Sequence, residues 1–283
     1  RPKNHSFTTL GVVEAFLLLH ELTGVTEYLR FAADEELGKG VRIVPAALKS
    51  WEQKLSPRRK LSPEELEGSD NAPRAKGCHM YRIFERCLMQ LKLHRMEPDN
   101  ALTRMSRRLL AGMTRREKGG MLITGGSGEH EQWHENQNGT EQVAETCATV
   151  YGLWWLSEML RLEDDLGYGD FMERALYNAF FASQHPDGRQ MFYFTPFSGS
   201  RTPFVRDAFC CPNNFRRGMA SLGGLIYYRT ADRLAVNLYA PSRTVLSFGN
   251  GVHTIVSQKT NYPAAGSVEL VLEPTEPLVF SLY

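Results

Sequence analysis

Three of the five cysteines stand beside residues that would suit a metal site. Cys210 and Cys211 are adjacent, and adjacent cysteines rarely form a disulfide with each other because the geometry strains the peptide. Glu145 and Cys147 lie within a strongly apolar stretch, residues 143–162, where a buried carboxylate needs a partner. Three thiols and one carboxylate make a donor set that zinc accepts in tetrahedral geometry. Zinc binding by these four residues is therefore our first hypothesis.

The spacing limits how two of these residues could reach one metal ion. Glu145 and Cys147 are two positions apart, and such residues do not share a face of a regular helix. They could meet one ion only at a helix start or a distorted turn, and the loop-like residues 136–140 favour a helix start. The alternative is that the cysteines are small buried hydrophobes, which is how we interpret Cys78 and Cys87.

A glycine-rich loop, residues 124–131, carries two further carboxylates, Glu129 and Glu131. Neither the lysine of a phosphate-binding loop nor a repeat of glycines after a strand is present, so the pattern does not indicate nucleotide binding. Glycines let a backbone approach a ligand closely, and a carboxylate in a cleft is the usual general acid of sugar hydrolysis. A solvated acidic loop is the alternative interpretation.

The elements that would position these residues are mainly helical. Three segments show helical apolar spacing interrupted by a polar or glycine-containing break, namely residues 10–32, 88–109 and 153–179. Repeated units of helix, short turn and helix predict an α/α bundle or toroid. Residues 40–76 contain several prolines and mixed charge, and we expect a long excursion there with at most short helices.

The apolar pattern changes to alternation near residue 231, which is typical of strands. Gly249-Asn250-Gly251 lies between two alternating runs and predicts a hairpin. We therefore expect two domains, residues 1–230 and 231–283. The last residues, 277–283, resemble a strand that stops without a partner, so we expect the chain to be a fragment of a longer protein.

Composition excludes several classes of protein. The 283 residues carry 33 Lys and Arg against 32 Asp and Glu, whereas nucleic-acid or polybasic membrane binding needs a basic excess. No apolar run reaches the roughly 18 residues of a membrane span. The odd number of cysteines without framework spacing argues against a disulfide-stapled secreted module. Unpaired thiols suit a reducing compartment, so we expect a cytoplasmic protein, and a homodimer is one possibility.

Taken together, these segments resemble glycoside hydrolase family 127, the β-L-arabinofuranosidase family. The resemblance extends over nearly the whole chain except residues 40–76. It is carried by motifs in a fixed order, among them His5-Ser-Phe7, Gly125-Gly-Ser-Gly-Glu129, Glu145-Thr-Cys-Ala148, Arg174-Ala-Leu-Tyr-Asn178, Cys210-Cys-Pro-Asn213 and Thr260-Asn-Tyr-Pro263. The combination of Glu-Thr-Cys-Ala with a later Cys-Cys-Pro is the specific part.

The resemblance implies a mainly α fold, an (α/α)6-barrel (six-hairpin toroid) fragment followed by the start of an all-β sandwich domain. It places a zinc ion, Zn2+, on the four residues singled out above, Glu145, Cys147, Cys210 and Cys211. It assigns Cys210 as the nucleophile and Glu129 as the general acid and base, with Glu131 as a rival two residues later. It also places Tyr193, His79 and His5 where sugar-contacting groups lie.

The implied activity is that of a retaining glycoside hydrolase that releases non-reducing-end β-L-arabinofuranose, or a related sugar, from a carbohydrate substrate. In that mechanism the thiolate of Cys210 attacks the anomeric carbon while Glu129 protonates the leaving oxygen. Three other hypotheses remain open. The chain could be a non-catalytic carbohydrate-binding homologue with a structural zinc, a redox-active α/α protein that uses its adjacent cysteines, or a sugar lyase on a similar toroid.

Overall fold

The computed structural model describes residues 10–33, 79–114, 119–133, 142–163, 165–249 and 251–283, and of residues 10–12 only the backbone. His5, Cys78 and the excursion predicted for residues 40–76 lie outside these ranges. Within them, no helix is long and apolar enough to cross a membrane.

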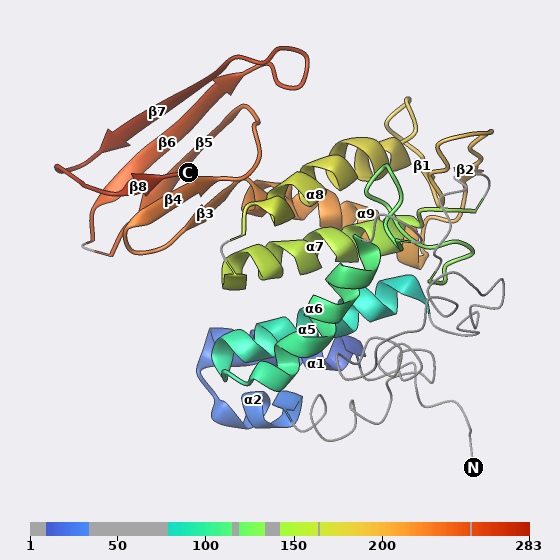
Figure 1. Ribbon diagram of the computed structural model, residues 1–283, viewed down its shortest axis with the longest axis horizontal. Coiled ribbons are helices and arrows are strands. Elements are labelled where there is room, and N and C mark those ends of the chain that lie inside the picture. The colour runs from blue at the N-terminus through green and yellow to red at the C-terminus, as the bar shows by residue number, and fades with distance from the viewer. Residues whose placement is uncertain (1–9, 34–78, 115–118, 134–141, 164, 250) are drawn as a thin grey trace, which may run out of the picture.

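Helices form the first and larger part of the chain (Figure 1). They are α1 (Leu10–Thr23), α2 (Thr26–Ala33), α5 (Met80–Met96), α6 (Asn100–Met113), α7 (Thr146–Glu163), α8 (Gly167–Ala175) and α9 (Cys210–Ser221). A π-helical turn (Leu176–Phe180) and a 3-10 turn (Phe181–Ser183) follow α8, and another 3-10 turn (Leu222–Leu225) follows α9. The three predicted helix pairs are confirmed as α1 with α2, α5 with α6, and α7 with α8.

Local signals at the predicted breaks explain why each pair turns where it does. Gly24 ends α1 with φ of +70°, a left-handed conformation that glycine adopts without a steric penalty. Asp99 caps α6 by accepting a hydrogen bond from the backbone N–H of Ala101 at 2.8 Å. Asp165 accepts one from the N–H of Gly167 at 2.9 Å, at the start of α8. Short connections of this kind make consecutive helices antiparallel neighbours.

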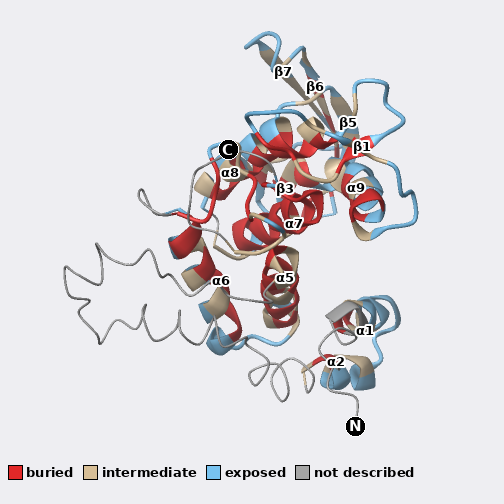
Figure 2. Ribbon diagram, turned by 90° about the vertical axis from the view of Figure 1, so that its right-hand side faces the viewer, coloured by how far each residue is buried: buried red, intermediate tan, exposed pale blue. Residues whose placement is uncertain are grey.

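Helix α7 is the centre of the helical core, because it packs against α5, α8 and α9. Nearly all of its residues are buried, as the red ribbon of Figure 2 shows for α5 and α7. Phe84 of α5 and Trp155 of α7 meet with ring centroids 5.4 Å apart. Each large side chain buried in this way contributes about 1.5–3 kcal/mol, so the core fixes the relative positions of the helices that carry the site.

The strands lie mainly at the C-terminal end (Figure 1). Two three-stranded sheets are present in the described residues, β3 (Tyr227–Arg229), β4 (Arg233–Val236) and β8 (Ser281–Leu282), and β5 (Ser242–Ser247), β6 (His253–Thr260) and β7 (Val268–Pro274). A short pair, β1 (Met191–Phe192) and β2 (Pro203–Phe204), lies before α9. Leu234, Phe248 and Val256 form the buried cluster of the two larger sheets.

The predicted hairpin is confirmed, because β5 and β6 pair antiparallel with Ser247 opposite His253. Two expectations are refined. The last residues do have a partner, since β8 pairs with β4 in parallel, and that strand is confined to Ser281–Leu282. The sheet also begins earlier than residue 231, because β3 precedes that position and pairs with β4. The predicted domain boundary at residues 230 and 231 stays a prediction.

Candidate active site

Three helix starts meet at one end of the helical core. His79 directly precedes α5, Glu145 directly precedes α7, and Cys210 is the first residue of α9. The first N–H groups of a helix are free to bind anions and carry partial positive charge. This end of the core therefore favours thiolates and carboxylates, which are the groups found there.

The thiols and the carboxylate predicted as metal ligands form one compact cluster. The sulfur atoms of Cys147 and Cys211 lie 3.1 Å apart, and Cys211 Sγ lies 3.4 Å from Glu145 Oε1. With Cys210 added, the four possible ligand atoms all lie within 4.8 Å of one another. Glu145, Cys147 and Cys211 have no exposed surface, whereas Cys210 is half-buried.

The start of α7 resolves the spacing problem of Glu145 and Cys147. The helix begins at Thr146, so Glu145 is outside it, and Ala144 before it has φ of +54°. Thr146 anchors this turn, because its N–H donates to the carbonyl of Tyr193 at 2.9 Å and its hydroxyl donates to the carbonyl of Phe192 at 2.8 Å. The predicted helix start at this position is confirmed, and it lets both side chains reach one point.

The buried atoms of the cluster are those that a metal ion would satisfy. Glu145 is completely buried, and within the described residues its Oε2 accepts no hydrogen bond; His79 Nδ1 lies 3.4 Å away. Burial raises the pKa of Glu145 to about 8, and the negative charge of Glu131 adds to the effect. Three thiols and a carboxylate within reach of one point, with a buried carboxylate oxygen that accepts no hydrogen bond from the described residues, can hold a metal ion.

Cys210 differs from the two other thiols. Hydrogen bonds from Cys147 and Cys211 lower its pKa, and its place at the start of α9 acts in the same direction. Burial raises the pKa of Cys211, and the hydrogen bond given to Cys210 raises that of Cys147. Cys210 is therefore the thiol that combines accessible surface with thiolate character, the two properties that a nucleophile needs.

A carboxylate, an imidazole and a phenol lie next to Cys210. The hydroxyl of Tyr193 donates a hydrogen bond to Glu131 and lies 3.6 Å from Cys210 Sγ. His79 Nε2 lies 3.4 Å from Glu131 Oε2, and His79 Nδ1 lies 3.4 Å from Glu145 Oε2. Burial lowers the pKa of His79, and the charge of Glu131 opposes the shift. Tyr193 and His79, predicted to contact the sugar, thus lie in the same site as the cysteines.

The glycine-rich loop presents Glu131 through a tight turn. Glu129 and Gln132 exchange two backbone hydrogen bonds of 2.9 Å, and the two residues between them, His130 and Glu131, have φ of +48° and +65°. Positive φ at both central positions is the geometry of a type I′ turn, and it is strained for residues other than glycine. The N–H of Met80 holds the turn by donating to the carbonyl of Glu131 at 2.7 Å. Glu129 is half-buried at the base of this turn.

One polar residue at the cluster was not singled out from the sequence. The amide Nδ2 of Asn214 donates to Cys147 Sγ at 3.2 Å, and Asn214 is buried. Its position on α9, three residues after Cys211 and four after Cys210, places it on the helical face of the thiols. That spacing is the signal that could have identified it.

Comparison with known proteins identifies the family. The family model described as "Beta-L-arabinofuranosidase, GH127 catalytic domain" matches residues 4–224. The chain belongs to this family. A curated relative, the non-reducing end β-L-arabinofuranosidase of Bifidobacterium longum subsp. longum, is 27% identical over 211 residues, which are 68% of this chain and 31% of the relative.

Solved structures agree with this assignment. A GH127 β-L-arabinofuranosidase from Geobacillus stearothermophilus T6 superposes with a TM-score of 0.72 at 27% identity, covering 93% of this chain and 45% of that one. A GH127 β-arabinofuranosidase at 22% identity shares the fold, with a TM-score of 0.69 and coverage of 92% of this chain and 39% of that one. The predicted fold class, helices of an (α/α)6 barrel followed by β strands, is confirmed, and the chain spans less than half the length of these relatives.

Proposed function

We propose that this chain carries the active site of a retaining glycoside hydrolase that releases non-reducing-end β-L-arabinofuranose or a related sugar. The observation that supports this most is the placement of Cys210. It is the thiol with lowered pKa and accessible surface, and it shares the hydroxyl of Tyr193 with the carboxylate of Glu131. Because Cys210 and Glu131 contact the same hydroxyl, they lie close together, as the nucleophile and the acid of a retaining glycoside hydrolase must if both are to reach one sugar. Family membership supports the same chemistry.

We infer that Glu145, Cys147, Cys210 and Cys211 hold a zinc ion. Thiolate-rich sets with one oxygen donor suit zinc better than magnesium or calcium, which prefer oxygen ligands throughout. The ion would also satisfy Oε2 of Glu145, which accepts no hydrogen bond from the described residues. When bound, zinc would keep the thiols of the cluster deprotonated at neutral pH.

The proposed reaction has two displacements. The sulfur of Cys210 attacks the anomeric carbon, and the glycosidic C–O bond breaks as a carboxylic acid gives its proton to the leaving oxygen. In the second step the resulting carboxylate takes a proton from water, and the water oxygen displaces sulfur from the same carbon. Two inversions give net retention, and the thiolate and the acid are regenerated.

We assign the acid and base role to Glu131 in preference to Glu129, which the resemblance first indicated. Glu131 makes the contacts to Tyr193 and His79, and the strained turn is what aims it there. His79 and Tyr193 would orient the sugar as well as this carboxylate. His5 stays a predicted sugar contact.

The test is the dependence of rate on the leaving group. Replacing a general acid slows substrates with poor leaving groups by about 10²–10⁴-fold and spares those whose leaving group needs no proton. We expect this pattern for Glu131→Gln, measured with alkyl and nitrophenyl β-L-arabinofuranosides, and near-complete loss of both activities for Cys210→Ser. The matched control is Glu129→Gln. If Glu129→Gln shows the leaving-group pattern and Glu131→Gln does not, our assignment is wrong.

A further inference from the structure

The face of α9 that carries the thiols continues into a buried polar contact. Asn214 is 8% exposed, and its Nδ2 lies 3.2 Å from Cys147 Sγ on the neighbouring helix α7. One turn later, Nη1 of Arg217 donates to Oδ1 of Asn214 at 3.1 Å. The amide therefore connects a sulfur atom of the cluster to a guanidinium group.

The hydrogen-bonding capacity of these groups fixes which way the amide points. A guanidinium can only donate, so the oxygen of Asn214 must face Arg217. The amide nitrogen is then left for Cys147, and a sulfur atom accepts its N–H. Reversing the amide would place two donors together and its oxygen against the sulfur. Arg217 thus determines that Asn214 offers Cys147 a hydrogen-bond donor.

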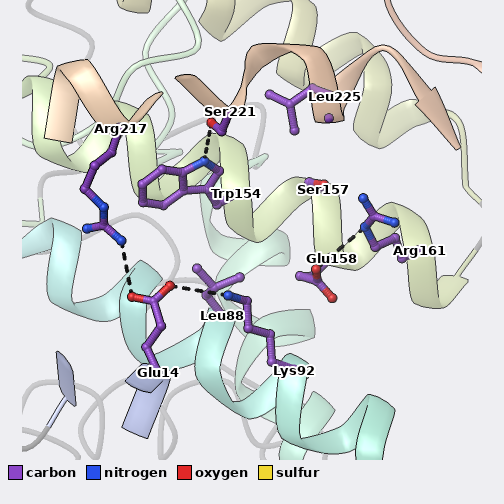
Figure 3. A pocket seen from close by; sticks show the side chains of 11 residues that line it. Glu14, Leu88, Lys92, Trp154, Ser157, Glu158, Arg161, Arg217, Ser221 and Leu225 are labelled. Atoms are coloured by element: carbon purple, nitrogen blue, oxygen red, sulfur yellow. Dashed lines mark hydrogen bonds and ion pairs between the residues drawn. The ribbon is translucent and has the colours of Figure 1, made fainter. Parts of the chain in front are cut away.

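Arg217 is itself held from two other helices. Its guanidinium lies 4.9 Å above the ring of Trp154, 3.3 Å from the hydroxyl of Tyr151 and 3.3 Å from Glu14 Oε2. Glu14 of α1 also pairs with Lys92 of α5 at 3.3 Å. Figure 3 shows Arg217, Trp154, Glu14 and Lys92 along the wall of a cavity of about 240 Å³, with Arg217 and Lys92 both directed at Glu14. These contacts hold the guanidinium beside the amide, on a side chain that is 48% exposed.

We propose that Asn214 is a positioning residue whose amide N–H orients and stabilises the sulfur of Cys147, with Arg217 fixing the orientation of that amide. Groups that hydrogen-bond to metal ligands set ligand orientation, and their loss weakens metal binding by about 10–100-fold. A donor to sulfur also offsets part of the negative charge that three thiolates and a carboxylate bring together. The role in metal binding rests on the zinc site proposed above, whereas the contact between Asn214 and Cys147 does not.

The chain offers a matched control one residue earlier. Asn213 accepts a hydrogen bond from Arg216 at 3.3 Å, with the same residue types and the same spacing as Asn214 and Arg217. Asn213 and Arg216 are exposed, in contrast to the buried Asn214, and the side-chain hydrogen bond described for Asn213 joins it to Arg216 and not to a cysteine. A substitution at Asn213 therefore changes the same kind of contact without removing the hydrogen bond to Cys147.

The first experiment measures zinc affinity by competition with a chromophoric chelator. We expect about 10–100-fold weaker binding for Asn214→Ala. Asn214→Asp should be weaker still, because it matches the shape of asparagine but presents a carboxylate to the sulfur. If Asn214 only filled space, Asn214→Asp would bind zinc more tightly than Asn214→Ala. We expect no change for Asn213→Asp, and wild-type affinity in Asn214→Asp would overturn the proposal.

Cobalt provides a spectroscopic signature that packing alone would not change. Loss of the N–H donor makes the sulfur a stronger electron donor, so the sulfur-to-cobalt charge-transfer band should move to longer wavelength in Asn214→Ala. The band should stay in place in Asn213→Asp. An unchanged band in Asn214→Ala would contradict the inferred hydrogen bond.

A metal-free experiment separates this inference from the zinc proposal. Urea unfolding in the presence of a chelator compares Asn214→Ala, Cys147→Ala and the double variant. We expect non-additive effects, because the second substitution should cost less once the first has removed the contact. Additive effects would overturn the proposal. If the effects of the two substitutions are non-additive and the wild-type protein binds no zinc, the contact between Asn214 and Cys147 is supported and the zinc site is refuted.

Discussion

Glu85 gives the stability of this protein a defined dependence on pH. It lies on α5 and is 6% exposed. Burial raises its pKa to about 7 from an ordinary value of 4.5; the charge of Arg82 opposes this, and that of Glu14 adds to it. The folded protein therefore holds the Glu85 proton more tightly than the unfolded chain does.

The sign and size of the effect follow from this difference. A carboxyl whose pKa is raised by folding stabilises the folded state most below about pH 4.5, and this stability is lost as the pH rises from about 4.5 to about 7. At about 1.4 kcal/mol for each tenfold change in proton affinity, the loss is about 3 kcal/mol. Glu85→Gln removes it, because glutamine does not ionise. The free energy of unfolding of the variant, relative to that of the wild type, should therefore rise by about 3 kcal/mol from pH 4 to pH 8.

The assay is urea unfolding followed by circular dichroism at several pH values for both proteins. The quantity to plot is the difference in free energy of unfolding, since pH effects common to both proteins cancel. Glu97→Gln is the control, because Glu97 is exposed at the end of the same helix and its variant should show no growing advantage. A difference between Glu85→Gln and wild type that stays constant from pH 4 to pH 8 would refute the reasoning.

Three further predictions concern packing and metal binding. Gly218→Ala should lower the free energy of unfolding by about 1–3 kcal/mol in thermal unfolding, because a Cβ would lie 2.8 Å from the buried ring of Phe180. Gly223→Ala should cost less, because no atom of the described residues lies within 4 Å of its added Cβ, and equal costs would contradict this explanation. Thr146→Val should lower the free energy of unfolding by about 1–3 kcal/mol, because the hydrogen bond to the carbonyl of Phe192 is lost. The variant should also be less active, and full activity would count against the role of Thr146 in anchoring Tyr193. Dialysis against a chelator should lower the melting temperature, and added zinc should restore it. A ligand whose free concentration is 100–1,000 times its Kd raises the free energy of unfolding by about 3–4 kcal/mol. An unchanged melting temperature would count against a tightly held ion.

The helix pairs and the hairpin could be predicted because their signals are local. Gly24 and Asp99 end and begin helices through their own backbone and side-chain geometry. The sequence Gly-Asn-Gly between alternating runs predicts a hairpin in the same way, and β5 pairs with β6 on either side of it. The partner of the last strand could not be predicted, because β8 pairs with β4 across nearly fifty residues of chain.

In the candidate site, too, some features could be predicted from the sequence and others could not. The cluster around Cys147 and Cys211 could be predicted because a rare combination of residue types marks it. The contacts of Glu131, on which its proposed role in place of Glu129 rests, could not be predicted, since they depend on a strained turn held by the N–H of Met80. The contacts of Arg217 were also beyond prediction, because they join residues far apart in the sequence.

The most direct test of the central claim is the zinc content of freshly purified, reduced protein, measured by elemental analysis beside Cys147→Ala and Cys210→Ala. The account predicts about one zinc ion per chain in the wild type and a clear loss in both variants, because each variant would lack one of the four proposed ligands. Circular dichroism of the variants confirms that they are folded. No zinc in the wild type, or the same zinc content in all three proteins, would contradict the thiolate site on which the proposed chemistry depends.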